Sequence, residues 1–180
     1  MIIIQLYLIR IVSRAYPVIF QNIDVCKTNK AHMFVTVWLG ILEISTGKLT
    51  AASAGHEYPM VNTGSKFELL NDKHGMPVGA FKKAKYKDYE LTLKKGDSIF
   101  LYTDGVAEAN DADNQLFGTD RTLAALNEHP DAAPEEMLKN VRAAVDAFVK
   151  DAPQFDDLTM LCIHYIGKES EVNHEERTDD

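Results

Sequence analysis

Two groups of carboxylates in this sequence stand beside apolar segments that are typical of buried strands. Asp104 follows SIFLYT and precedes Gly105, and the pair Asp156 and Asp157 comes just before LTMLCIHYI. A carboxylate at the end of a buried strand is held by a rigid scaffold, and hard oxygen ligands of this kind suit Mg²⁺ or Mn²⁺ rather than zinc. Two such groups can hold cations that share a water and lower its pKa, and that water can attack a phosphate in line.

The same carboxylates have an interpretation that involves no chemistry. Asp-Gly pairs are common in β-turns, and aspartates are common in loops before strands. The glycine at position 105 is compatible with a site, because a small residue lets water and phosphate come close. The residues by themselves leave both interpretations open.

His56, in the segment GHEYP, is another candidate for chemistry, as an acid, a base or a ligand. No cysteine or second histidine lies at ligand spacing, so we expect a turn histidine that is bonded to the backbone. No Gly-x-Ser-x-Gly segment supports a serine hydrolase, and Gly75 and Gly79 do not lead from a strand into a helix as a nucleotide site requires.

One basic run, FKKAKYK, contains Lys82, Lys83, Lys85 and Lys87. It could dock the surface of an acidic phosphoprotein. The alternative is a solvated strand edge, where lysines discourage pairing with another chain.

The composition of the 180 residues is that of a globular chain, with 46% hydrophobic residues and a formal net charge of −8. Residues 167–180 are acidic and predict a disordered tail. A nucleic-acid-binding protein would show a clustered basic face, so we expect no nucleic-acid partner. Cys26 and Cys162 lie far apart, which favours a reduced, cytoplasmic setting.

The N-terminal segment, residues 1–19, is apolar but atypical. Gln5, Arg10 and Arg14 interrupt it, so it falls short of a stable membrane span, and it lacks the features of a signal peptide. A core helix or strand is the expected structure, and a membrane-associated segment is the alternative.

The order of the elements predicts an α+β fold built on antiparallel sheet. Extended segments are expected at residues 33–44, 49–54, 59–62, 66–70, 86–93 and 98–103, and a last strand at 157–166. Helices are expected at residues 118–129, capped by Thr119 or Asp120, and at 130–151, with Pro134 in the first turn.

Three motifs, MFVTVWLGILEISTGKLTAASAGHEYP, GDSIFLYTDGVAEANDADNQLFG and APQFDDLTMLCIHY, resemble the SpoIIE/RsbU-type PP2C-like (PPM) serine/threonine phosphatases of bacteria. The resemblance covers residues 20–166 and implies a β-sandwich of two antiparallel sheets flanked by helices. It also implies a site for two Mn²⁺ or Mg²⁺ ions at one edge of the sandwich. Asp104 and Asp156 match the catalytic metal ligands, and Asp157 is expected to be a neighbour of the site rather than a ligand.

The resemblance implies a function as well. Family members remove phosphate from serine or threonine, by attack of a metal-bound water, on STAS-domain (anti-anti-sigma) proteins that regulate sigma factors. We therefore expect a metal-dependent protein phosphatase with a phosphorylated STAS-domain partner.

The sequence departs from the family pattern at one point. The family's Asp-x-x-Gly-(Lys/His)-Gly segment, which supplies a bridging aspartate, is absent, and so are the first strands of the sandwich. A truncated reading frame or a wrong start codon is the expected cause. The second hypothesis is therefore a catalytically incompetent remnant, or a binding module for a STAS-like partner. Exposed strand edges would also favour pairing with another chain, such as a homodimer.

Overall fold

The structure is a computed structural model that describes residue 22, residues 24–27, residue 29, and residues 33–71, 74–153 and 156–167. The apolar segment 1–19 and all of the acidic tail except Gly167 lie outside these residues, as do the predictions made for them. The described elements are β1 (Val37–Glu43), β2 (Lys48–Ala54), β3 (Met60–Asn62), β4 (Phe67–Leu69), β5 (Asp88–Thr92), β6 (Ser98–Tyr102), α2 (Asp104–Ala107), α3 (Gly118–Glu128), α4 (Pro134–Val149) and β7 (Met160–His164).

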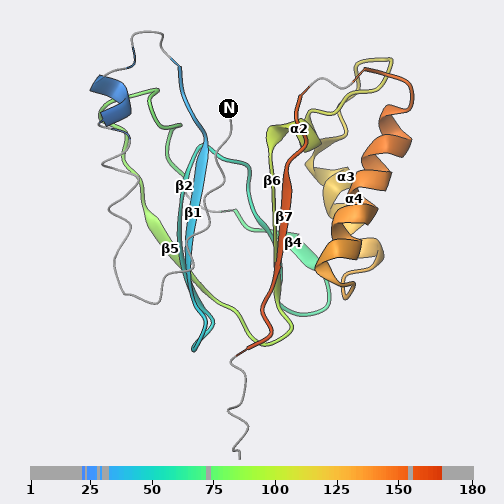
Figure 1. Cartoon of the computed structure of the whole chain (residues 1–180), viewed down its shortest axis with the longest axis horizontal. Helices are drawn as coiled ribbons and strands as arrows, with labels where there is room; N and C mark the ends of the chain where they lie inside the picture. Colours follow the sequence, from blue (N-terminus) through green and yellow to red (C-terminus); the bar gives the residue numbers. More distant parts are fainter. Residues whose placement is uncertain are drawn as a thin grey trace, which may run out of the picture.

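These strands form two antiparallel sheets that face one another (Figure 1). One sheet has the order β1-β2-β5, and the other has the order β4-β3-β6-β7. Helices α3 and α4 lie against the outer face of the four-stranded sheet. The predicted α+β sandwich with flanking helices is therefore confirmed.

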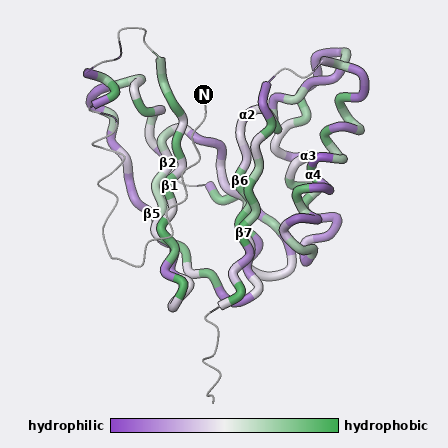
Figure 2. Tube along the Cα trace, in the orientation of Figure 1, coloured by the Kyte–Doolittle hydropathy of each residue, from purple (hydrophilic) through white to green (hydrophobic). Residues whose placement is uncertain are grey.

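Strand β6 shows how the sequence builds two cores at once. All five of its residues are buried, and successive side chains point to opposite faces of the sheet. Ile99 and Leu101 pack between the two sheets with Trp38 of β1, whereas Phe100 and Tyr102 pack beneath the helices. Hydrophobic residues accordingly run along the strands where the two sheets face each other (Figure 2).

Helix α4 covers the sheet with one apolar face. Met137, Val141 and Val145 are buried at helical spacing, and Pro134 occupies the first turn as predicted. Of the helices in the described part of the chain, none is long and apolar enough to cross a membrane.

Helix α3 begins at Gly118, where the predicted range begins, but its cap differs from the prediction. The predicted caps, Thr119 and Asp120, were wrong, because the N-cap residue is Phe117. Its ring packs edge-on against Phe148 of α4, and its N–H donates to the carbonyl of Ala109 at 2.7 Å. Burial of this aromatic ring fixes where the chain enters the helix.

Candidate metal-binding end of the sandwich

Asp104 lies where the central strand β6 passes into the short helix α2. The strand ends at Tyr102, Thr103 is the N-cap, and Asp104 is the first helical residue. One carboxylate oxygen of Asp104 accepts a hydrogen bond from the N–H of Gly105 at 2.9 Å. The sequence predicted a turn or a strand end here, and the structure shows one turn of helix.

Thr103 joins the YTDG motif to the DDLT motif. Its N–H donates to the carbonyl of Thr159 at 3.0 Å, and its hydroxyl donates to the carbonyl of Asp157 at 3.2 Å. The hydroxyl also accepts from the N–H of Thr159 at 3.2 Å, and Thr103 is fully buried. These three bonds bring the two predicted acidic motifs to the same end of the sandwich.

Gly105 is required by the close approach of the two motifs. A Cβ atom at this position would lie 2.3 Å from the carbonyl oxygen of Asp157 and 2.9 Å from its carbonyl carbon. Both distances are shorter than real Cβ contacts. The sequence suggested a glycine that gives ligands access, and the structure adds that only a glycine lets the two motifs touch.

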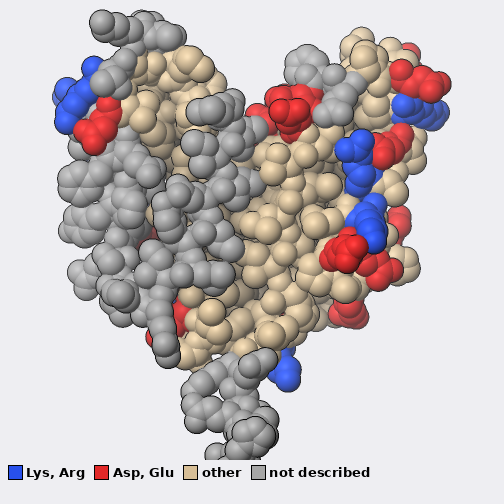
Figure 3. Space-filling model, viewed as in Figure 1, with Lys and Arg blue, Asp and Glu red and all other residues tan. Residues whose placement is uncertain are grey.

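Asp156 and Asp157 have different surroundings. A carboxylate oxygen of Asp156 accepts from the N–H of Asp157 at 2.7 Å, and both residues are exposed. Asp157 contributes its carbonyl to Thr103. Acidic side chains gather at this end of the molecule, beside a hollow between its two halves (Figure 3).

His56 is buried near Asp104, with only 3% of its surface exposed. Burial lowers the pKa of His56, and the charge of Asp104 opposes this effect. Its Nδ1 lies 3.3 Å from the hydroxyl of Thr36, and its Nε2 makes no hydrogen bond with any described residue. The predicted backbone-bonded turn histidine was therefore wrong, since the partner found is a side chain.

Glu57 and Glu108 add further carboxylates to this region. Burial raises the pKa of Glu57, and the charges of Asp104 and Glu108 raise it further. Sequence reasoning missed Glu108. Its spacing of four residues from Asp104 was the available signal, because such residues lie on one side of a helix.

We expect replacement of His56 by glutamine to reduce the loss of stability that the chain shows in acid. A histidine whose pKa is lowered by folding is protonated more readily in the unfolded state, so stability falls as pH drops below about 6.5. Urea unfolding at about pH 7.5 and about pH 5.5 would measure this loss. The loss should be smaller in His56→Gln than in the wild type, and His129→Gln, which alters an exposed histidine after α3, is the control. Equal losses in all three chains would contradict the prediction.

The described residues fit part of a divalent cation site. Asp104 and Asp156 are hard oxygen donors of the kind that Mg²⁺ and Mn²⁺ prefer. Within the described ranges, however, no group of three or more His, Cys, Asp or Glu side chains could hold a metal ion. Two divalent cations need more anionic oxygens than these two aspartates supply, since the cations repel each other.

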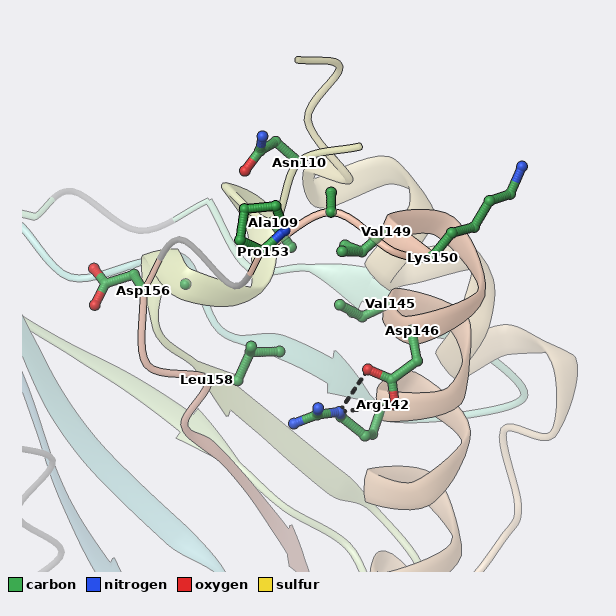
Figure 4. Close-up of a pocket in the computed structure, with 12 residues that line it drawn as sticks. Ala109, Asn110, Arg142, Val145, Asp146, Val149, Lys150, Pro153, Asp156 and Leu158 are labelled. Carbon is green, nitrogen blue, oxygen red and sulfur yellow. Dashed lines mark hydrogen bonds and ion pairs between the residues drawn. The ribbon is translucent and has the colours of Figure 1, made fainter. Parts of the chain in front are cut away.

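A pocket of about 180 Å³ lies beside the acidic end, between α2, the last turns of α4 and the loop before β7 (Figure 4). Its wall contains Gly105 and Asp156, together with the ion pair between Arg142 and Asp146. The carboxylate of Asp156 points away from the pocket (Figure 4). The pocket and the acidic end are therefore neighbours on opposite sides of the Asp156 backbone.

Solved structures share this architecture. The phosphatase domain of the cell fate determinant SpoIIE from Bacillus subtilis, described as Mn presoaked, matches with a TM-score of 0.55 and 17% identity, over 75% of this chain and 58% of that chain. The fold is thus that of the PP2C-like phosphatases. The sequence profile of the family described as Stage II sporulation protein E (SpoIIE) matches residues 8–166, and the chain belongs to this family.

Two curated relatives agree with this assignment. The phosphoserine phosphatase RsbU of Bacillus subtilis is 30% identical over 151 residues, which are 81% of this chain and 42% of RsbU. Protein IcfG of Synechocystis sp. is 29% identical over 134 residues, which are 73% of this chain and 21% of IcfG. The chain therefore spans less than half the length of either relative.

Proposed function

We propose that this chain acts as a protein serine/threonine phosphatase that uses Mn²⁺ or Mg²⁺ bound at Asp104 and Asp156. The observation that carries the proposal is the joining of the YTDG and DDLT motifs by Thr103. Membership of the SpoIIE family and the likeness to RsbU, a phosphoserine phosphatase by name, support it.

In this proposal Asp104 and Asp156 would hold the cation with carboxylates that the backbone already orients. The N–H of Gly105 restrains the carboxylate of Asp104, and the N–H of Asp157 restrains that of Asp156. When bound, the cation supplies positive charge to phosphate oxygens and lowers the pKa of a water molecule. Glu57 and Glu108 add negative potential that favours cation binding.

The resemblance to SpoIIE/RsbU-type phosphatases extends the proposal to the substrate. It would be a phosphorylated STAS-domain, anti-anti-sigma protein, and the setting would be the cytoplasm. Residues 20–166 would form the phosphatase domain, to which the family profile adds residues 8–19, and the tail 167–180 would lie outside it.

One observation favours a second candidate function. Among the described residues, no group of three or more His, Cys, Asp or Glu side chains is arranged so that it could hold a metal ion. The chain would then be a module that binds the phosphorylated STAS-domain protein without hydrolysing it.

Phosphate release from a STAS-domain protein phosphorylated on serine would test the proposal. We expect release in the presence of Mn²⁺ and none in the presence of EDTA, because the cation supplies the charge for the reaction. Binding of the phosphoprotein without release would select the second candidate. Absence of both Mn²⁺ binding and phosphoprotein binding would overturn both.

A further inference from the structure

Four large apolar side chains are exposed in two segments outside the strands, one before β1 and one between β4 and β5. They are Met33 (65% exposed), Phe34 (61%), Met76 (54%) and Phe81 (52%). They come from two segments that are joined by paired backbone bonds. Val35 donates to Val78 at 2.9 Å, and Val78 donates to Val35 at 2.8 Å.

The basic run continues this apolar surface. Residues 82–87 contain four of the 19 Lys and Arg residues in the sequence, and all four lysines are exposed. None of the four forms an ion pair with another described residue. Gly75 packs against the backbone of Lys85 and the ring of Tyr86, which places Met76 beside the run. We call this set the lysine–aromatic surface: Met33, Phe34, Met76, Phe81, Lys82, Lys83, Lys85 and Lys87.

The lysines do not guard a strand edge, which was the alternative drawn from the sequence. Strand β5 begins at Asp88, after the last of the four lysines. Lys82 and Lys83 instead occupy the corners of a turn closed by a bond from the N–H of Ala84 to the carbonyl of Phe81 at 2.9 Å. Protection of an edge therefore does not explain them.

The lysine–aromatic surface lies at the same end of the sandwich as the acidic residues. Thr36, two residues after Phe34, contacts His56, which is within reach of the charge of Asp104. Gly75 donates to the carbonyl of Ser53 at 2.9 Å, and the ring of His74 lies 4.4 Å from that of Tyr58. Figure 1 shows the loop between β4 and β5 on the side of the three-stranded sheet, and α2 at the corresponding end of the other sheet.

We propose that the lysine–aromatic surface docks an acidic face of the phosphoprotein substrate, an inference that rests on the proposed phosphatase function. The chain has a net charge of −8, and the carboxylates around Asp104 repel a phosphorylated protein. A cluster of lysines that form no ion pair with described residues supplies the attraction that the acidic end lacks, and exposed aromatic and methionine side chains supply area to bury.

The test compares two variants with the same change of charge. Lys82→Glu/Lys83→Glu alters the surface, and Lys94→Glu/Lys95→Glu alters exposed lysines in the turn between β5 and β6, at the opposite end (Figure 1). Binding of the full chain to a fluorescently labelled, serine-phosphorylated STAS-domain protein would be measured by anisotropy, which requires no turnover. We expect the first variant to bind about tenfold more weakly and with less dependence on salt, and the second to bind as the wild type does.

A second pair of variants tests the apolar residues of the lysine–aromatic surface. Phe81→Ser should weaken binding, whereas Ile44→Ser, an equally exposed apolar residue elsewhere, should not. Equal effects of surface and control variants, or no effect of either, would overturn the proposal. The proposal would also be overturned if the surface bound phosphatidylserine vesicles and not the phosphoprotein. A third contrary result would be that the surface variants lose a dimer while their binding of the phosphoprotein is unchanged.

Hydrolysis of p-nitrophenyl phosphate separates this inference from the proposed function. This small substrate has no protein surface to dock, so the surface variants should hydrolyse it as the wild type does. If no chain hydrolyses it but binding is lost only in the surface variants, the phosphatase proposal fails and docking stands.

Discussion

Replacement of Asp104 by asparagine is expected to lower Mn²⁺ affinity and phosphate release by about a hundredfold or more. The asparagine keeps the shape of the side chain but removes the charge that attracts a divalent cation. Its carbonyl oxygen can still accept the 2.9 Å bond from the N–H of Gly105, so the fold should be retained. A loss of Mn²⁺ affinity and of phosphate release would then result from weaker cation binding and not from unfolding.

Asp113→Asn is a matched control for this experiment. Asp113 is an exposed residue of the loop between α2 and α3, and its replacement by asparagine removes the same charge without altering the YTDG or DDLT motif. Isothermal titration with Mn²⁺ and a phosphate-release assay would measure both variants. The role proposed for Asp104 would be untenable if Asp104→Asn bound Mn²⁺ as tightly as Asp113→Asn.

Replacement of Gly105 by alanine should damage both stability and the acidic end. The new methyl group would lie 2.3 Å from the carbonyl oxygen of Asp157, which Thr103 holds by a hydrogen bond. Relief of this overlap must move the two motifs apart and break that bond. We expect a loss of about 1–3 kcal/mol in the free energy of unfolding, as for other overpacked sites, together with weaker Mn²⁺ binding.

The chain offers a matched control in Gly64. A Cβ atom at this position would meet no atom within 4 Å, so Gly64→Ala should leave stability nearly unchanged. Urea unfolding of both variants would make the comparison. Wild-type stability in Gly105→Ala would show that the two motifs can separate without cost, contrary to our interpretation of their contact.

Strands were predictable from the sequence where one face is buried and the other is not. YKDYELTL alternates between polar and apolar residues, and β5 alternates between exposed and partly buried residues. The first long segment was predicted to be extended from Met33, but β1 begins at Val37. Its pairing with β2 stops at Ala54, because Gly55 adopts a φ of +73° and turns the chain away. Hydrophobicity alone carries no information about where a partner strand ends.

The sequence indicated which acidic residues to consider at this end of the sandwich, but it did not indicate how they are brought together. Asp104 and Asp156 were candidates because of their places beside apolar strands, and their role as metal ligands is a prediction that the family resemblance implies. The role of Thr103 depends on the register of β6 and β7, in which Tyr102 pairs with Met160. Register is a property of two segments far apart in the sequence, so no local pattern specifies it. The sequence did not predict helix α2, because four residues are too few to show a helical period.

The bonds of Thr103 also determine when this end of the molecule can form during synthesis. They join residues that are 54 and 56 positions apart, and β7 is the last of the described elements to be made. A domain generally folds as a unit, so the part of this domain that contains β6 depends on β7. Until the segment that includes Asp157 and Thr159 has emerged, Thr103 lacks the partners that bring Asp104 and Asp156 to the same end. The nascent chain thus cannot present both carboxylates together to a cation before the segment that leads into β7 has been translated.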